Sequence, residues 1–267
     1  MTTHYNAIFL SDIHLGNPDC KAELLLEFLA LHTCNSLYLV GDIVDLWQMQ
    51  KQFTWPEKHN EVLHKIIALS HTNCQVKYLP GNHDAPLQKY NDLHIGDIEV
   101  KRKMVHTTIL KQQFLVLHGD QFDEYVTLGK FQNWLGNTGY DLVLLLNRQY
   151  NLFRSWKKAP YRSLAGYIKS RIKGAQAAIH RYKVACIDEA KFLNLDGVIC
   201  GHIHHPEQDE IDGILYFNDG DWIENCSALC ETQSGDMILL DWVAERERQK
   251  SELRSIKNDS STNLNAA

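Results

Sequence analysis

The feature that most constrains this chain is a series of polar clusters, each of which follows an apolar run typical of a buried strand. Val76 to Leu79 is one such run; Pro80-Gly81 then turns the chain and Asn82-His83-Asp84 follows. Comparable clusters follow other apolar runs at Asp12-Ile13-His14, Gly41-Asp42, His118-Gly119-Asp120 and Gly201-His202-Ile203-His204. Amides, imidazoles and carboxylates at strand ends indicate a polar site at one edge of a sheet.

The apolar pattern of the first hundred residues predicts alternating strands and helices. Strands are expected at residues 5–10, 37–40 and 76–79, and helices at 21–32 and 56–70. This strand–helix–strand order requires helical crossovers, so the three strands should be parallel. Their polar clusters should then lie together at the carboxyl edge of the sheet.

Beyond residue 95 the pattern changes to short strands around one long helical segment. Further strands are expected at 98–100, 105–110, 114–117, 198–200, 211–217, 222–227 and 237–243. We predict an α/β fold with a core formed by residues 1–122 and 196–243 and a helical cap insertion at 123–195. Residues 244–267 are charged and then Ser/Asn-rich, which predicts a flexible tail.

Composition and termini indicate the compartment. The seven cysteines are odd in number and contain no Cys-x-x-Cys pair, which favours a reduced chain over a disulfide framework. The polar N-terminus and the lack of an apolar run of about 20 residues argue against a signal peptide and a membrane span. We therefore expect a cytoplasmic protein. A net charge of −6 gives no overall signal for nucleic acid.

Seven of the clustered side chains could share one metal site: Asp12, His14, Asp42, Asn82, His118, His202 and His204. The set is too rich in nitrogen for Mg²⁺ or Ca²⁺ alone, and it lacks the thiolates of a structural zinc site. Mn²⁺, Fe²⁺ and Zn²⁺ all fit. A single His or Asp at a strand end is more often a cap, but five such clusters favour a metal site. Seven ligands suit two ions that share a carboxylate.

The motifs Asp-x-His, Gly-Asp, Gly-Asn-His-Asp, His-Gly-Asp and Gly-His-x-His, in this order between Ile8 and Asp221, resemble the calcineurin-like metallophosphoesterase superfamily. The resemblance implies a four-layer α/β/β/α sandwich and a dinuclear site. It assigns Asp12, His14 and His204 to the first ion and Asn82, His118 and His202 to the second. It makes Asp42 the bridging ligand and His83 an outer-sphere catalytic histidine, with attack on phosphorus by a metal-bridging hydroxide.

Other acidic residues near the motifs are candidates for supporting roles. Asp45 or Asp84 could orient a ligand imidazole. Asp120 is balanced between such a role and turn chemistry.

The insertion has an unusual composition. Residues 142–187 contain no acidic side chain, but ten basic ones are interspersed with aromatic and aliphatic residues. This favours an anionic membrane surface or an amphiphilic phosphate-bearing substrate, and an ordinary helical cap with solvated cations is the alternative. Nucleic acid is the least favoured partner. Candidate substrate-binding residues in or beside the insertion are Asp123, Arg162, Lys169 and Arg171.

Three features resemble the UDP-2,3-diacylglucosamine diphosphatase branch of this superfamily. They are the helical cap at this position, the Ser-Asp-x-His-Leu start and the run from Gly41 to Trp47. This resemblance implies a peripheral membrane enzyme of lipid A biosynthesis that uses Mn²⁺ to release UMP and a lipid monophosphate. That branch usually carries Arg where this chain has His83. A phosphodiesterase or phosphatase for another phospholipid or a soluble nucleotide is the alternative, and a non-catalytic scaffold is the alternative of another class.

Overall fold

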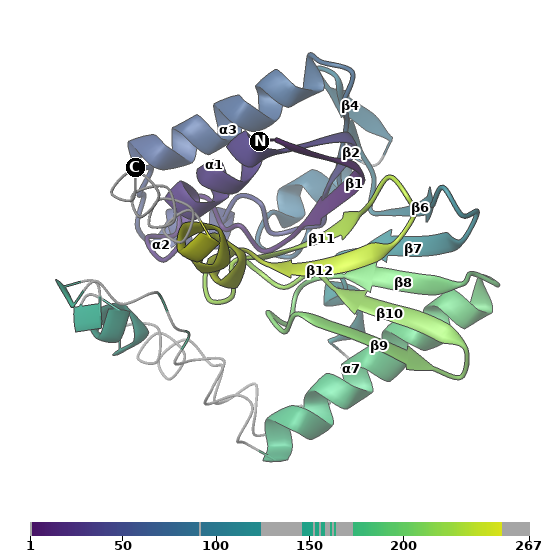
Figure 1. Cartoon of the computed structure of the whole chain (residues 1–267). Helices are drawn as coiled ribbons and strands as arrows, with labels where there is room; N and C mark the ends of the chain where they lie inside the picture. The colour runs from purple at the N-terminus through teal and green to yellow at the C-terminus, as the bar shows by residue number, and fades with distance from the viewer. Residues whose placement is uncertain are drawn as a thin grey trace, which may run out of the picture.

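The computed structural model describes residues 2–90, 92–123, 146–151, 153–154, 156–157, 161, 163 and 173–252. Two mixed β-sheets lie face to face, and helices cover their outer faces (Figure 1). The named helices are α1 (Ala22–Leu31), α2 (Leu46–Lys51), α3 (Glu57–Ser70) and α7 (Lys173–Phe192), with short 3-10 helices η1 (Ala85–Lys89) and η2 (Asp120–Phe122). Residues 146–151 and 242–252 are also helical. None of the described helices is long and apolar enough to span a bilayer.

The first sheet contains β1 (Thr3–Leu10), β2 (His32–Leu39), β3 (Gln75–Tyr78), β4 (Leu93–Ile95), β5 (Ile98–Val100), β11 (Ser227–Glu231) and β12 (Met237–Asp241). Its strand order is β12-β11-β1-β2-β3-β5-β4. β1, β2 and β3 are parallel, as the alternating pattern predicts.

The second sheet contains β6 (Lys103–Thr107), β7 (Gln113–Leu117), β8 (Gly197–Cys200), β9 (Glu207–Ile211) and β10 (Ile214–Asn218), in the order β6-β7-β8-β10-β9. β7, β8 and β10 are parallel. Both sheets therefore have central parallel strands whose carboxyl ends can carry a site.

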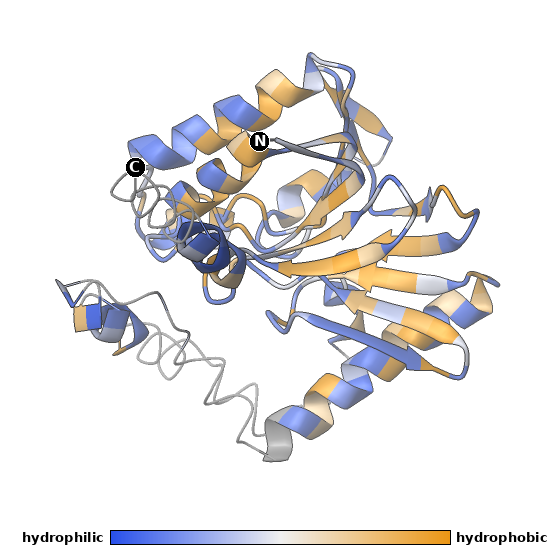
Figure 2. Ribbon diagram, viewed as in Figure 1, coloured by the Kyte–Doolittle hydropathy of each residue, from blue (hydrophilic) through white to orange (hydrophobic). Residues whose placement is uncertain are grey.

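Alternating side chains of the central strands explain the layering. In β1, Ile8 and Leu10 join the core beneath α1 and α3, whereas Ala7 and Phe9 face the second sheet. Buried residues on α7 recur at helical spacing and pack on the outer face of the second sheet. Figure 2 shows apolar residues concentrated along the strands between these layers. The predicted α/β/β/α sandwich is confirmed.

The fourth layer comes from the segment that the sequence assigns to the insertion. α7 lies within residues 123–195, yet its Tyr182 and Cys186 are buried against β8 and β10. The chain's division into core, cap and tail otherwise remains a prediction. Residues 242–252 are helical and extend into the segment 244–267 that is predicted as a flexible tail, and Arg246 Nε lies 2.6 Å from Glu27 Oε2.

Several strand predictions are wrong in their bounds: β6 ends at Thr107 and β12 at Asp241, and in two other cases a turn intervenes. Residues 222–225 form a turn, and β11 begins only at Ser227, because the Asp221 carboxylate accepts the backbone N–H groups of Ile223, Glu224 and Asn225. The run 211–217 is interrupted by a hairpin turn at Asp212-Gly213, where both residues have positive φ.

Candidate metal centre

The loops that follow β1, β2, β3, β7 and β8 converge, and they carry all seven candidate ligands. Within the first sheet, Asp12 N donates to Gly41 O at 3.0 Å. Across the two sheets, His202 N donates to Asp12 Oδ2 at 2.8 Å. These backbone contacts place loops from distant parts of the sequence beside one another.

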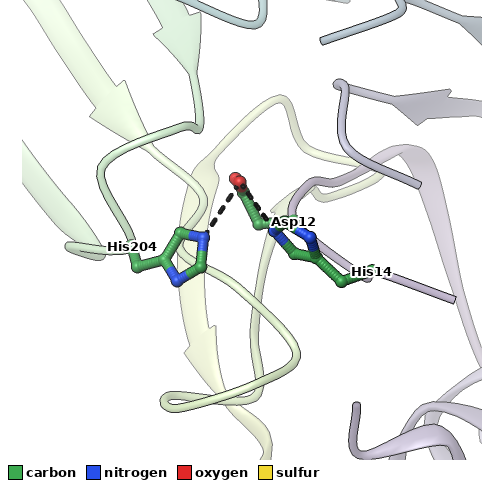
Figure 3. Close-up of side chains that lie close together, drawn as sticks. All are labelled: Asp12, His14 and His204. Carbon is green, nitrogen blue, oxygen red and sulfur yellow. Dashed lines mark hydrogen bonds and ion pairs between the residues drawn. The ribbon is translucent and has the colours of Figure 1, made fainter. Parts of the chain in front are cut away.

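The first ligand group is formed by Asp12, His14 and His204, whose potential ligand atoms lie within 4.8 Å of one another (Figure 3). Asp12 Oδ1 lies 3.1 Å from His204 Nε2 and 3.7 Å from His14 Nε2. Asp12 belongs to the loop after β1, and His204 to the loop after β8.

The second group is formed by Asp42, His118 and His202 at the same 4.8 Å spacing. His118 Nε2 lies 3.3 Å from both Asp42 Oδ2 and Asn82 Oδ1. Asp42 Oδ2 is also 3.9 Å from His14 Nε2, so it faces both groups. This is the geometry expected of a carboxylate shared by two ions.

Five of these ligands have left-handed backbone conformations. The φ values are 50° for Asp12, 53° for His14, 54° for Asp42, 70° for His202 and 48° for His204. Glycines allow the close approach of these loops, because a Cβ at Gly41 would lie 2.2 Å from His118 Nδ1. Residues held in this sparsely populated region cluster at functional sites.

Three of the candidate ligand imidazoles each have one ring nitrogen within hydrogen-bond distance of a group outside the cluster. His14 Nδ1 is 3.0 Å from Asp45 Oδ2, and His118 Nδ1 donates to the Val40 carbonyl at 2.8 Å. His202 Nε2 is 2.8 Å from Asp123 Oδ1. Such partners fix the tautomer and the orientation of a metal-ligating histidine.

The electrostatics of the cluster favour bound cations. Burial would lower the pKa of His14, but Asp12, Asp45 and Asp42 raise it to about 10. Burial would also lower the pKa of His204, but Asp12 and Asp221 raise it to about 9. His14 Nε2 is buried and has no hydrogen-bond partner among the described residues. A mixed nitrogen and oxygen cluster with this unsatisfied atom fits two divalent ions of the Mn²⁺, Fe²⁺ or Zn²⁺ type.

His83 lies beside the ligands and shares a carboxylate with one of them. Its Nδ1 is 2.8 Å from Asp45 Oδ1, while Asp45 Oδ2 contacts His14. Asp45 also begins α2 by accepting Gln48 N at 2.9 Å. The ring of Trp47 packs against His83, with centroids 4.5 Å apart. Asp45 therefore orients two imidazoles, one of them a candidate ligand.

Asp84 and Asp120 contact different groups from Asp45. Asp84 accepts hydrogen bonds from Gly81 N, Ile43 N and the Tyr78 hydroxyl, so it ties two loops together and contacts no ligand imidazole in a described hydrogen bond. Burial and the charge of Asp42 raise the pKa of Asp84. Asp120 Oδ2 accepts Gln88 Nε2 at 3.1 Å.

The candidate substrate residues fall into two sets. Asp123 contacts His202, so its described partner is a candidate metal ligand. Arg162, Lys169 and Arg171 lie outside the described residues.

Sequence reasoning underestimated the segment from Asn218 to Asn225, because it interpreted residues 218–221 as a turn bordering the site and residues 222–227 as a strand. Asn218 Nδ2 donates to Gly201 O at 2.7 Å, and Asn225 Nδ2 donates to His204 O at 3.2 Å. The buried Glu224 carboxylate lies 3.9 Å from His204 Nδ1. The available signal was a polar Asn-Asp-Gly-Asp run directly after a strand.

The fold and the candidate metal ligands fit a metal-dependent phosphoester hydrolase, and a family comparison shows this class. The family model "Calcineurin-like phosphoesterase" matches residues 5–206, and the chain belongs to this family. A "UDP-2,3-diacylglucosamine hydrolase" from Wigglesworthia glossinidia brevipalpis is 24% identical over 222 residues, which cover 76% of this chain and 80% of that protein.

Solved structures with similar folds include a hypothetical protein, PH1004, from Pyrococcus horikoshii OT3. It has a TM-score of 0.47 and 14% identity, over 93% of this chain and 94% of that one. The phosphoesterase Yfce from E. coli has a TM-score of 0.43 and 16% identity, over 88% of this chain and 98% of that one.

Proposed function

We propose that this protein is a dinuclear phosphohydrolase in which Asp12, His14 and His204 hold one divalent ion, Asn82, His118 and His202 hold the other, and Asp42 bridges them. The observation that carries the proposal is the position of Asp42 Oδ2, 3.9 Å from His14 Nε2 and 3.3 Å from His118 Nε2. Mn²⁺ is the proposed metal, with Fe²⁺ and Zn²⁺ as alternatives.

The protein's residues have distinct parts in this chemistry. When bound, two divalent ions lower the pKa of water and neutralise phosphoryl oxygens. Asp45 holds His83 at Nδ1, which leaves Nε2 to give a proton to the departing oxygen. Water adds across one P–O bond, and the leaving group departs with the proton from His83.

The proposed substrate is a UDP-2,3-diacylglucosamine-like lipid-linked nucleotide, whose pyrophosphate would be cleaved to UMP and a lipid monophosphate. The name of the 24% identical relative supports it. So do two described residues of the predicted insertion, which contact loops close to the candidate ligands. Tyr161 Oη donates to Ile223 O at 3.3 Å, two residues before the Asn225 that holds His204. Arg148 forms a bidentate ion pair with the buried Asp19 of the loop after β1.

We also propose that the protein binds peripherally to an anionic membrane surface on the cytoplasmic side, and described residues of the same insertion support this. The side chains of Phe153 and Trp156 are exposed, at 53% and 81%. Lys157 Nζ lies 4.6 Å from the Phe153 ring, and Arg154 lies over the Tyr150 ring. Exposed aromatic and basic side chains side by side suit the interface of an anionic bilayer.

A second candidate substrate class is another phospholipid or a soluble nucleotide. It is supported by His83 and its bond to Asp45, because the resembling lipid A branch usually has Arg at this position. A non-catalytic scaffold is the remaining alternative, and the complete ligand set weighs against it.

A hydrolysis panel tests the substrate. With Mn²⁺ present, UDP-diacylglucosamine, UDP-N-acetylglucosamine, a CDP-lipid and a cyclic nucleotide are compared by kcat/KM. The lipid-linked nucleotide should be hydrolysed most efficiently, with UMP as a product. A preference for the soluble nucleotides or the CDP-lipid would favour the second candidate.

The Asp42→Ala variant tests the dinuclear site, because it removes a ligand from both ions. Turnover should fall to background and metal content below two ions per chain. Asp97→Ala is the matched control, since it removes an exposed carboxylate paired with His71. Near-normal turnover in Asp42→Ala would contradict the dinuclear proposal.

A further inference from the structure

Asp123 lies at the predicted start of the insertion, and its side chain contacts a candidate metal ligand. It directly follows η2 and is the last residue described before residue 146. Its Oδ1 lies 2.8 Å from His202 Nε2, although 49% of its side chain is exposed. The contact joins the start of the predicted insertion to the second ligand group.

The backbone around His202 is fixed by other contacts. His202 has a φ of 70°, and its N–H donates to Asp12 Oδ2 at 2.8 Å. The carbonyl of Gly201 accepts hydrogen bonds from Asn218 Nδ2 at 2.7 Å and from the Tyr182 hydroxyl at 3.2 Å. These contacts set the position of the His202 Cα. The imidazole itself packs against the rings of His118 and Tyr182, with centroids 5.0 Å and 6.0 Å away, and its described hydrogen-bond partner is Asp123.

Two other candidate ligand imidazoles, those of His14 and His118, show what an outer hydrogen-bond partner does. His14 and His118 each engage Nδ1 outside the cluster, with a carboxylate and a backbone carbonyl, and each turns Nε2 towards Asp42. His202 is bonded at Nε2 instead, so its remaining nitrogen is Nδ1. A neutral imidazole has one N–H and one lone pair, so a bond at Nε2 leaves the lone pair on Nδ1.

A contribution to folding stability does not explain Asp123 well. A pair in which one partner is half exposed adds little to stability, because water and salt screen it. A carboxylate on the outer nitrogen of a ligating histidine fixes the tautomer and raises ligand basicity. Orientation therefore accounts for the contact better than stability does.

We propose that Asp123 is a positioning residue for the second metal ion, which accepts the Nε2–H of His202 and leaves Nδ1 as the ligand atom. This rests on the proposed dinuclear site. In this proposal, the affinity for the second metal ion depends on the residue at which the predicted insertion begins. Asp123 then acts through His202 and need not touch the substrate.

The test is metal binding by chelator-treated protein. Mn²⁺ is titrated into wild type, Asp123→Ala, Asp123→Asn and His202→Ala by isothermal titration calorimetry, and metal content is measured after gel filtration. Asp123→Ala should weaken the second site by about 10–100-fold and leave the first unchanged. Asp123→Asn keeps an acceptor oxygen of the same size, so its affinity should lie between those of Asp123→Ala and wild type. His202→Ala sets the value for loss of a ligand.

The outcomes separate the two proposals. Asp97→Ala, which breaks an exposed Asp–His pair elsewhere, should not change either affinity. Unchanged affinity at both sites in a folded Asp123→Ala protein would overturn the inference, and a raised KM with unchanged metal binding would assign Asp123 to substrate contact instead. If Asp123→Ala does not fold, Asp123→Asn decides by the same criterion. Fewer than two ions in wild type would overturn the dinuclear site itself.

Discussion

At the scale of single residues, the candidate ligands are held by their backbone before any metal is considered. Asp12, His14, Asp42, His202 and His204 all have φ between 48° and 70°. Each such conformation costs on the order of 1–3 kcal/mol and persists only where the surrounding structure imposes it. Hydrogen bonds between neighbouring loops do so here, including His14 N to Asp42 O at 2.8 Å. Strain concentrated in the ligand set is the mark of a preformed site.

His83 should be separable from the ligands by mutation. We expect His83→Ala to reduce kcat by about 10²–10⁴-fold, because a positioned proton donor typically contributes that much. Its ring contacts Asp45 and Trp47, so metal content should stay at two ions per chain. Steady-state kinetics and metal analysis on the same preparation check this. Loss of one ion would instead make His83 a ligand.

The raised imidazole pKa values predict that metal binding depends on pH. Because neighbouring carboxylates outweigh burial, the pKa is about 10 for His14 and about 9 for His204 in the metal-free protein. Both imidazoles are then protonated at pH 7 and must lose a proton to bind a cation. The apparent affinity of the protein for divalent metal ions should therefore rise as the pH rises from 7 to 9. Calorimetry in buffers of different ionisation enthalpy should detect proton release, and heats independent of buffer would contradict it.

At the scale of elements, Asp84 joins two of the ligand-bearing loops. Its carboxylate accepts Ile43 N at 2.9 Å from the loop after β2 and Gly81 N at 2.5 Å from the loop after β3. Asp42 directly precedes Ile43 in the sequence, and Asn82 directly follows Gly81. Asp84 is fully buried, so water cannot replace it.

We expect Asp84→Ala to destabilise the fold as well as the site. Each buried amide left without an acceptor costs about 1–3 kcal/mol. Thermal denaturation should show a lower Tm than wild type, and Mn²⁺ affinity should fall because the Asp42 and Asn82 loops are no longer tied. Asp97→Ala should leave both unchanged. A Tm for Asp84→Ala equal to that of wild type would contradict this role.

At the scale of the whole molecule, the two sheets place their parallel strands so that the carboxyl ends meet at one edge. β1, β2 and β3 supply Asp12, His14, Asp42 and Asn82, while β7 and β8 supply the remaining three histidines. Neither sheet alone holds a complete ligand group, because His204 of the second sheet pairs with Asp12 of the first. The core between the sheets therefore sets the separation of the two halves of the site.

The insertion makes a prediction for membrane binding by the whole protein. Charge reversal at Arg154 and Lys157 should weaken binding to vesicles that contain anionic lipid, by about 1 kcal/mol per charge near the surface. Reversal of the exposed Lys58 and Lys111, outside the insertion, is the matched control. Co-sedimentation at low and physiological salt measures both. Equal binding by the two variants would return the insertion to the simpler interpretation of a solvated helical cap.

Local sequence patterns predicted most of the strands, helices α1 and α3, and the residue types of the candidate site, but not α2, β4 or β9. Apolar runs and the polar clusters after them are local patterns, so Gly81-Asn82-His83-Asp84 and its four partner clusters could be recognised without coordinates. The same local patterns gave the parallel order of β1, β2 and β3. They failed at residues 222–225, where the Asp221 carboxylate engages the backbone in place of a strand partner.

Which side chains meet depends on how the two sheets pack in the folded chain. The contact of Asp12 with the backbone of His202 spans 190 residues, and that of His202 with Asp123 spans 79. Such pairs leave no local signal, because the packing of two sheets, and not the spacing along the chain, fixes their distance. The same packing made α7 the fourth layer and brought Glu224 beside His204. Asp45, Asp84 and Asp123 look alike as acidic residues near motifs, and their different partners emerge only in the folded chain.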